Sequence, residues 1–590
     1  MCGICGELSF RHESVDAAKI KSMMDKLERR GPDNAGDYYE AGLGLGHRRL
    51  AIIDLSEKSN QPMVDDELGL VLVFNGTIYN YKELRQDLQA KGYQFQSEGD
   101  SETILKAYAC WGEDCVDHLH GMFAFSIWDR KRKQLFLARD RLGIKPLYYS
   151  CTDSFFRFAS NTQSLLTGGG IDTDIDAIGL HHQLTLHAVI PAPRTILKGV
   201  RKLQPGFCLV VTPDGQMRER QYWQLNAQRS DKIRTEAQWI EEIHEALRES
   251  VRKRKEIADV PVGVLLSGGL DSSLLVALLA EAGVEDIRTF SIGFEDIGDE
   301  QGSEFFYSDQ VVERYKTNHQ KLHIPNSEVL KRLPEAVAHM AEPMVGQDAV
   351  AFYLLSEQVS KHVKVVQSGQ GADEVFGGYF WYPRMQAESG TDIERFANHY
   401  FDRDHDEWLA TVDSRFHGRD HTRELISQLL AEPGADEFLD RVLRTDVTTL
   451  IVDDPVKRVD NMTMAWGLEA RVPFLDQNLV ELAAQMPPEL KLKSDGKHIL
   501  KSIARGIVPD DVIDRPKGYF PMPALKYVRG EFLDFMREVL LSEASLQRRL
   551  FNPQYIEKLL AEPEGHMTRL NGSKLWHCAL LEYWLQTNGL

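Results

Sequence analysis

The sequence lacks the features that would place it in several large classes of protein. No apolar run approaches the roughly 20 residues that span a bilayer, and the opening "MCGICGELSFRHES" has no long apolar core after a basic segment, so we expect neither a membrane span nor a signal peptide. Only 7 cysteines occur in 590 residues, and they are too scattered for a disulfide framework, which makes a reducing cytoplasm the expected setting. Basic residues are also in deficit, 69 against 89 acidic ones, and a net charge of −20 argues against nonspecific binding to nucleic acid or to a membrane surface.

The chain divides into two parts of different character. Its first third is rich in strand and hairpin patterns, such as "LGLVLVFNGTIYN", an apolar strand expected to end at Asn75-Gly76, and "GMFAFSIWDRKRKQLFLARD", a hairpin around a charged turn. A polar stretch follows, and then Thr235 and Gln238 form a capping-box pattern at the start of an amphipathic helix. Since 590 residues exceed one core, we predict a first domain over residues 1–223, a linker over 224–235 and a second domain over 236–590.

A phosphate-binding loop is the clearest single motif. In "VGVLLSGGLDSSLLVALLAEAG", residues 262–266 predict a buried parallel strand, 267–272 a tight glycine turn and 274–282 a helix. Backbone N–H groups of such a turn converge on an anion at the positive end of the helix. The loop is not a Walker A motif, because no Gly-Lys-Ser/Thr follows it, and it carries an acid, Asp271. An acid among phosphate oxygens implies a cation between them, and Mg²⁺ is the usual one.

A second glycine-rich loop supports this interpretation. "VKVVQSGQGADEVFGGY" is another apolar strand running into glycines, and Asp373 just beyond it is a natural second carboxylate for the same metal. Lys517, in "DRPKGYF", could neutralise a phosphate, although a solvated surface lysine is the simpler alternative from the residues alone. The segment 399–408, "HYFDRDHDEW", has metal-ligand residue types, but its charge favours a solvated surface segment. Together these loops are typical of enzymes that cleave ATP between the α- and β-phosphates.

The first residues pose a separate question. Cys2 and Cys5 could form half of a zinc site or a redox CxxC, but no second ligand pair stands at suitable spacing. If the initiator Met is removed, Cys2 carries a free α-amine with a pKa of about 7.7–8.0 beside a thiol of about 8.5, and the neutral amine can take the thiol proton. An acyl-transfer nucleophile also needs an oxyanion hole, and Asn75 with the Gly76 N–H offers one, each such donor being worth roughly 10²–10³ in rate.

Read in order, the motifs resemble a known family over nearly the whole chain. "MCGICGEL", "RRGPDNAG", "GHRRLAIIDLS", "FNGTIYN", "GDSETIL" and "ARDRLGIKPLYY" are similar to the glutaminase domain of class II glutamine amidotransferases. "SGGLDSS", "SGQGADEVFGGY" and "MAWGLEARVPFLD" resemble the synthetase domain of glutamine-hydrolysing asparagine synthetases. The resemblance implies an α/β multi-domain protein: an N-terminal-nucleophile (Ntn) hydrolase αββα sandwich, followed by an adenine-nucleotide α-hydrolase-like (PP-loop ATPase) domain.

The resemblance also implies roles for particular residues. Cys2 would attack the side-chain amide of glutamine, and ammonia would then pass through an internal tunnel to a second site that adenylates a carboxylate. Asn75 and Gly76 would hold the oxyanion, and Lys517 would stabilise charge on the phosphates. The remaining implied contacts are Arg49 with the glutamine α-carboxylate, Asp100 with its α-ammonium, Asp271 and Asp373 with Mg²⁺, and Leu266, Ser267, Gly268, Gly269, Asp271, Ser272, Ile292, Ser368 and Gly369 with ATP.

Two departures from the family pattern bear on the acceptor. Thr77 stands where the glutaminase motif usually has Glu, and Gln370 stands where asparagine synthetases usually carry Glu near the acyl-adenylate. Gln cannot act as a base, so another group or the adenylate phosphate must take the proton from ammonia.

Several stretches resemble the asparagine-synthetase paralogue that amidates N-acetylglutaminylglutamine, whose product is a bacterial osmoprotectant. The expected function is therefore glutamine-dependent, ATP-dependent amidation of that dipeptide, with AMP and pyrophosphate released. Asparagine synthetase acting on aspartate is the alternative, and a β-lactam synthetase or a regulatory protein with an inactive synthetase half are further ones. The expected partners are small molecules, with neither nucleic acid nor membrane, and the chain could form a homodimer.

Overall fold

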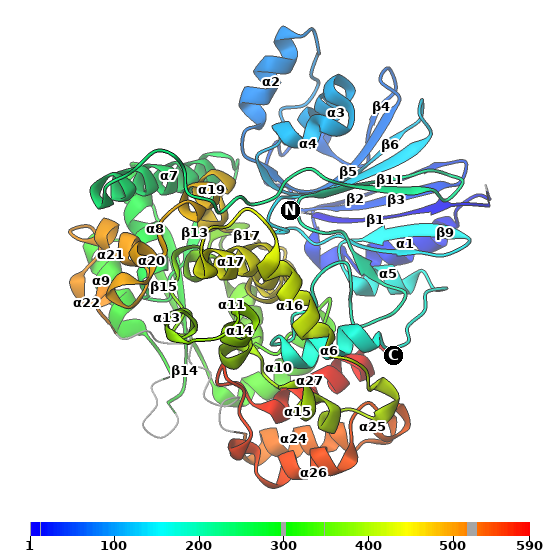
Figure 1. The fold of residues 1–590 in the computed structure, drawn as a ribbon. Coiled ribbons are helices and arrows are strands. Elements are labelled where there is room, and N and C mark those ends of the chain that lie inside the picture. Colours follow the sequence, from blue (N-terminus) through cyan, green and yellow to red (C-terminus); the bar gives the residue numbers. More distant parts are fainter. Residues whose placement is uncertain (1, 12, 297–301, 347, 516–527) are drawn as a thin grey trace.

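The computed structural model describes residues 2–11, 13–296, 302–346, 348–515 and 528–590 (Figure 1). Its N-terminal part is built on two six-stranded antiparallel sheets. The first has the order β10-β8-β9-β1-β3-β2: β10 (Arg201–Lys202), β8 (Tyr148–Cys151), β9 (Phe155–Ala159), β1 (Cys2–Ser9), β3 (Leu43–Arg49) and β2 (Asn34–Glu40). The second has the order β12-β11-β7-β6-β5-β4: β12 (Met217–Gln221), β11 (Phe207–Val211), β7 (Gln134–Arg139), β6 (Gly121–Asp129), β5 (Leu70–Ile78) and β4 (Met63–Asp65).

The two sheets pack face to face and carry helices on their outer faces. Alternate residues point into the space between the sheets, as the period of two requires, and fill it with Ile4, Leu8, Leu45, Val71, Val73 and Leu137. Helices α1 (Ala17–Asp25) and α5 (Thr162–Thr167) cover the first sheet, and α2 (Tyr81–Ala90), α3 (Asp100–Trp111) and α4 (Cys115–His118) lie on the side of the second. This four-layer arrangement confirms the predicted αββα sandwich.

The second part of the chain opens with a long helix and a parallel sheet. Thr235 and Gln238 form the predicted capping box at the start of α7 (Glu236–Glu256). The sheet has the order β15-β14-β13-β16-β17: β15 (Asn318–Ile324), β14 (Arg288–Phe294), β13 (Val262–Leu265), β16 (Val365–Gln367) and β17 (Glu469–Arg471). Helices α8 (Leu270–Glu281), α9 (Phe305–Tyr315), α10 (Asn326–Ala338) and α11 (Asp348–Val359) connect and flank its strands.

The rest of the described chain is helical. α6 (Ala177–Thr185) leaves the sandwich and packs against α15 (His405–Thr411) and α16 (His421–Ala431) of the second part (Figure 1). None of the helices in the described ranges is both long and apolar enough to cross a membrane. The other helices are α12 (Ala372–Phe376), α13 (Trp381–Ala387), α14 (Asp392–Tyr400), α17 (Phe438–Thr445), α18 (Lys457–Met464), α19 (Gln477–Ala484), α20 (Pro488–Leu492), α21 (His498–Ala504), α22 (Asp510–Ile513), α24 (Gly530–Leu540), α25 (Glu543–Arg548), α26 (Pro553–Ala561) and α27 (Lys574–Thr587).

Two expectations from the sequence are wrong in detail. The strand expected to end at Asn75-Gly76 continues to Ile78, because residues 76–78 pair with residues 121–123 of β6. The segment 399–408 is not a solvated surface segment, since Asp402, Arg403 and Trp408 are 2%, 1% and 1% exposed. Asp402 lies beside two histidines of other segments, and Arg403 donates to backbone carbonyl oxygens, whereas Asp404 and Asp406 are exposed. A sequence pattern does not reveal such distant partners.

Candidate functional site

The first candidate site lies where the start of β1 is paired with the end of β3. Antiparallel pairing sets Cys2, the first residue of β1, opposite Arg49, the last residue of β3. Gly76 and Thr77 of β5 and Asp100 of α3 complete a cavity of about 30 Å³. Four residues that the sequence assigned to glutamine chemistry, Cys2, Arg49, Gly76 and Asp100, therefore line one cavity. The fifth, Asn75, is not among the lining residues and is held beside Cys2 by a hydrogen bond.

Asn75 is positioned as a hydrogen-bond donor beside Cys2. Its side chain is completely buried, and its Oδ1 accepts a hydrogen bond from the Cys2 N–H at 3.0 Å. Its Nδ2 has no hydrogen-bond partner in the described part of the chain. Leaving a buried donor unpaired destabilises the fold, so its presence points to a partner supplied by a ligand. Burial also raises the pKa of the Cys2 thiol, so thiolate formation needs a nearby base.

Arg49 and Asp100 have fixed surroundings. Arg49 is 6% exposed and donates hydrogen bonds to the Ser56 carbonyl oxygen at 2.8 Å and to Asn60 Oδ1 at 2.7 Å, so it also fastens the loop that follows β3. Asp100 Oδ2 accepts a hydrogen bond from the Ile78 N–H at 3.0 Å, and burial raises the pKa of its carboxyl to about 6. Asp100 is thus largely ionised at neutral pH and can pair with a cation.

The second candidate site is a cavity of about 740 Å³ at the carboxyl ends of the parallel strands. Residues that follow β13 and β16 and residues 290–292 within β14 gather there, because parallel strands end at the same edge of a sheet. The two glycine loops touch: a Cβ placed on Gly369 would lie 3.0 Å from the Asp271 Cβ. Of the residues that the sequence assigned to ATP or to the acceptor, the lining includes Leu266, Ser267, Gly269, Asp271, Ser272, Ile292, Ser368, Gly369, Gln370 and Asp373.

Gly268 has a different place from the one implied by the resemblance. It is not among the residues that line the cavity, and it has a φ of +77° that an L side chain rarely adopts. A Cβ at this position would also lie 2.8 Å from the Ser308 N of α9. Gly268 therefore shapes the turn and lets α9 approach, and its neighbours in the loop face the cavity.

Lys497 is the residue that sequence reasoning missed. Its Nζ lies 2.6 Å from Asp271 Oδ2 and 2.9 Å from Asp373 Oδ1, so one ammonium joins the two predicted metal carboxylates. Burial opposes the charge, but the two carboxylates outweigh it and raise the pKa of Lys497 above its usual value. Gly378 makes room for this contact, since a side chain there would collide with both Asp373 and Lys497. A single lysine before α21 gives no sequence signal of this role. Lys517, predicted to hold phosphate, lies outside the described residues.

The two candidate sites are linked by buried polar contacts. Thr77 Oγ1, in the smaller cavity, lies 3.3 Å from Oε1 of Glu469, which belongs to β17 of the parallel sheet. Burial opposes ionisation of Glu469, yet Arg471 and other positive charges hold the pKa of its carboxyl at about 2. Arg30 adds a second link, because it donates to the Cys2 carbonyl oxygen at 3.3 Å and to Asp460 Oδ2 at 3.0 Å.

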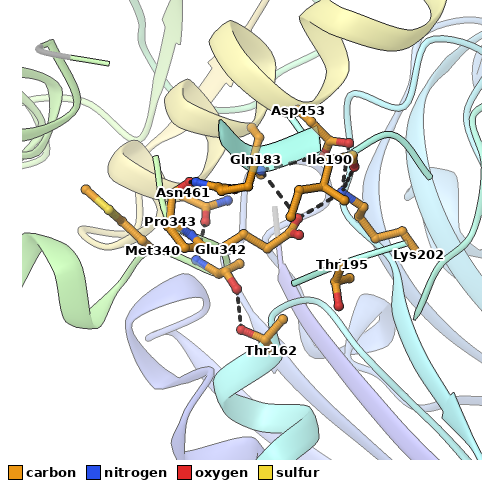
Figure 2. A network of polar contacts seen from close by, with 12 residues as sticks. Thr162, Gln183, Ile190, Thr195, Lys202, Met340, Glu342, Pro343, Asp453 and Asn461 are labelled. Atoms are coloured by element: carbon orange, nitrogen blue, oxygen red, sulfur yellow. Dashed lines mark hydrogen bonds and ion pairs between the residues drawn. The ribbon is translucent and has the colours of Figure 1, made fainter. Parts of the chain in front are cut away.

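A third link is a network of buried ions around residues 340–343 (Figure 2). Lys202 of β10 lies 2.9 Å from Glu342 Oε2 and 2.8 Å from Asp453 Oδ2, and all three side chains are at most 4% exposed. Figure 2 shows these three pointing toward one another, with Asn461 beside the same segment. Asn461 Oδ1 accepts from the Ala341 N–H at 2.8 Å, and the Thr162 hydroxyl donates to the Ala341 carbonyl oxygen. Side chains from both parts of the molecule thus hold one short segment where the two parts meet.

The fold and the paired cavities agree with the similarity of the chain to known proteins. Residues 1–223 match the "Glutamine amidotransferase domain" family, and residues 242–586 match the "Asparagine synthase" family. The two matches define the class, an ATP-dependent ligase that takes nitrogen from glutamine, with an Ntn-type glutaminase half and a synthetase half.

The chain belongs to the asparagine synthetase family. It is 32% identical to "Asparagine synthetase [glutamine-hydrolyzing] 1" of Bacillus subtilis, with 100% of this chain and 97% of the relative covered. It is 27% identical to "Asparagine synthetase B [glutamine-hydrolyzing]" of Escherichia coli, over 93% of this chain and 86% of the relative. It is also 27% identical to "Amidase chry2" of Gibberella zeae, over 86% of this chain and 85% of the relative.

Proposed function

We propose that the smaller cavity hydrolyses glutamine. Cys2 attacks the side-chain amide, its own α-amine takes the thiol proton after removal of Met1, and Asn75 Nδ2 with the Gly76 N–H holds the oxyanion. The unpaired, buried Nδ2 of Asn75 supports this role most strongly, because a donor fixed in advance needs no reorganisation when the oxyanion forms. Arg49 and Asp100 orient the α-carboxylate and α-ammonium of glutamine.

The larger cavity, in this proposal, binds ATP and adenylates a carboxylate. Residues 267–269 precede α8, and residues 270–272 form its first turn, so the N–H groups there and the positive end of the helix attract phosphate. Asp271 and Asp373 fit a divalent cation, since one ammonium already lies within 3 Å of both carboxylates. Mg²⁺ bound by these two residues would neutralise phosphate charge. Lys497, and Lys517 from the predicted loop, would add positive charge beside the phosphates.

Ammonia would travel from the first cavity to the second through the protein interior. The path would run past Thr77 and Glu469 toward the end of β16, where Ser368 begins the second glycine loop. The buried contacts between the two parts keep this region closed to water, which would otherwise protonate and dilute the ammonia. In this proposal the glutaminase domain covers residues 1–223 and the synthetase domain covers residues 236–590, joined through 224–235. The path then runs from the first domain to the second.

For the acceptor, we propose N-acetylglutaminylglutamine. The observation that carries this choice is that Gln370 lines the larger cavity. The resemblance implies Glu at this position in enzymes that use aspartate. A neutral amide there removes a negative charge next to the acceptor and suits a longer, less charged substrate. The relatives reported above include two named asparagine synthetases, at 32% and 27% identity, and one named an amidase, at 27%, so similarity alone is equally consistent with aspartate as the acceptor. Asparagine synthetase acting on aspartate is the second candidate.

An acceptor screen tests the proposal. Purified chain, ATP, Mg²⁺ and glutamine are combined with aspartate, glutamyl dipeptides and their N-acetylated forms, and pyrophosphate release is measured. We expect the N-acetylated dipeptide to exceed aspartate in kcat/KM by at least about 10²-fold, roughly 2.7 kcal/mol in the transition state. Gln370→Glu should lower the ratio of kcat/KM for the N-acetylated dipeptide to kcat/KM for aspartate. Comparable efficiency with aspartate would make the chain an asparagine synthetase, and no release with any acceptor would remove the ligase proposal itself.

A further inference from the structure

A cluster of histidines lies far from both cavities, where α6 meets α15 and α16. His181 is in the middle of α6, His405 is the first residue of α15, and Asp420 caps the start of α16. Their ligand atoms all lie within 4.8 Å of one another. In Figure 1, α6 lies among the helices of the second part, away from the sheets that precede it in the sequence. Three segments distant in the chain thus bring metal-ligand atoms together.

We propose that His181, His405 and Asp420 bind a divalent transition-metal cation of the zinc type, which ties α6 to α15 and α16. His181 Nε2 lies 3.2 Å from His405 Nδ1 and 3.7 Å from Asp420 Oδ1. Tetrahedral zinc with ligands at about 2.0–2.1 Å separates them by roughly 3.4 Å. The observed spacings bracket that value, so an ion can enter with only small side-chain movements.

The orientation of His181 suits a ligand. Its side chain is 1% exposed, and the surrounding helices hold its ring in place. Its other nitrogen, Nδ1, is hydrogen-bonded to Thr422 Oγ1, which also lies 2.9 Å from His182 Nδ1. A hydrogen bond from the second ring nitrogen is the usual device that orients a metal-bound histidine.

Access and charge are also compatible with binding. His405 and Asp420 are partly exposed, so an ion and a water as fourth ligand can reach the site from solvent. Asp420 Oδ1 accepts a hydrogen bond from the Arg423 N–H at 2.9 Å and keeps a second lone pair. The Arg423 guanidinium lies 3.7 Å from the other oxygen of Asp420, Oδ2. The attraction of a metal to its ligands must therefore exceed its repulsion by this positive charge.

A second cluster, His187, Asp402 and His577, shows what such residues do without a metal. Both His187 Nδ1, at 3.2 Å, and His577 Nδ1, at 3.4 Å, face Asp402 Oδ2. Burial opposes the charge of His187, but Asp402 raises its pKa, so a buried ion pair accounts for this arrangement. In the first cluster a hydrogen bond at 3.2 Å joins the two histidine nitrogens, and a metal that binds there would take the place of the shared proton.

The test uses Co²⁺ as a spectroscopic probe of the full-length chain. Protein is freed of metal with a chelator and then titrated with Co²⁺, and the intense visible band of tetrahedral Co²⁺ is followed. We expect the tetrahedral band to saturate at about one equivalent of Co²⁺ and Zn²⁺ to abolish it. His405→Gln and Asp420→Asn should each weaken binding by at least about 10²-fold. Asn remains a good helix cap, so Asp420→Asn should fold normally.

Two matched variants sharpen the test. His399→Gln changes a histidine of α14 that is paired with Glu388, and it should leave the Co²⁺ titration unchanged. Asp271→Asn should also leave the band unchanged, since carboxylates of the larger cavity do not supply nitrogen ligands. The proposal is wrong if wild-type protein gives no tetrahedral band, or if the band survives in both His405→Gln and Asp420→Asn.

Discussion

The two cavities differ in size, charge and construction. The glutaminase cavity is about 30 Å³, and strand pairing brings its residues together, so Cys2 and Arg49 are neighbours across two β-strands. The synthetase cavity is about 740 Å³ and is built from loops at the ends of parallel strands, with an ammonium between two carboxylates. A small neutral amide needs few donors held rigidly, whereas a nucleotide needs room and balanced charge. Perturbing one cavity should therefore leave the other working.

The largest expected effect comes from the carboxylates of the larger cavity. Asp271→Asn or Asp373→Asn should lower pyrophosphate release by about 10³-fold or more, because phosphate charge is then poorly neutralised. Removing Mg²⁺ with a chelator should have the same effect. Glutaminase activity should be unchanged in both experiments. Near-normal adenylation by either variant would show that the carboxylates do not hold the cation.

Lys497 provides the next test of the same cavity. Lys497→Met removes the cation that joins Asp271 and Asp373, and we expect pyrophosphate release to fall by about 10²-fold. Lys501→Met is the matched control, since Lys501 lines the same cavity but donates to the Ser494 carbonyl oxygen. It should lose less than about tenfold, because a single hydrogen bond to a backbone oxygen is a smaller interaction. Equal losses in the two variants would remove the special role of Lys497.

The buried ions that join the two parts of the molecule should matter for stability. Lys202→Met leaves Glu342 and Asp453 with less compensation, and breaking a buried ion network in this way costs about 3–5 kcal/mol in the free energy of unfolding. Urea unfolding followed by tryptophan fluorescence measures the change. Lys198→Met removes an exposed pair with Asp174 and should leave the urea midpoint where it is. If Lys202→Met also left the urea midpoint unchanged, the network would not hold the two parts together.

The smallest expected effect is a pH dependence in the glutaminase cavity. Asp100 must be ionised to pair with an ammonium, and its pKa is raised to about 6 by burial, so the ionised form is lost as pH falls through 6. Between pH 7 and pH 5 its ionised fraction falls about tenfold. The ratio of kcat/KM for glutamine, wild type over Asp100→Asn, should fall by about the same factor. A constant ratio across this range would show that Asp100 does not bind the α-ammonium.

Sequence patterns predicted what depends on local order and missed what depends on distant contacts. The order of strand, glycine turn and helix around residues 262–281 could be read directly along the chain. The helix begins at Leu270, however, inside the expected turn of 267–272 and ahead of the expected start at 274. Lys497, Gly378 and the network around Glu342 could not, since each acts only through partners brought close by the fold. The burial of residues 399–408 was missed for the same reason: charge predicts exposure unless a partner is known.

The central claim is that one chain contains two separate chemical sites, and Cys2→Ala tests it most directly. The purified variant is assayed for amide synthesis with glutamine and, in parallel, with ammonium salt at the same ATP and acceptor concentrations. The account predicts loss of glutamine-dependent synthesis by at least about 10³-fold, since no nucleophile remains. Ammonia-dependent synthesis should stay within about twofold of wild type, because the larger cavity keeps every residue that lines it. Loss of both activities in a variant with wild-type circular dichroism and urea midpoint would contradict the account.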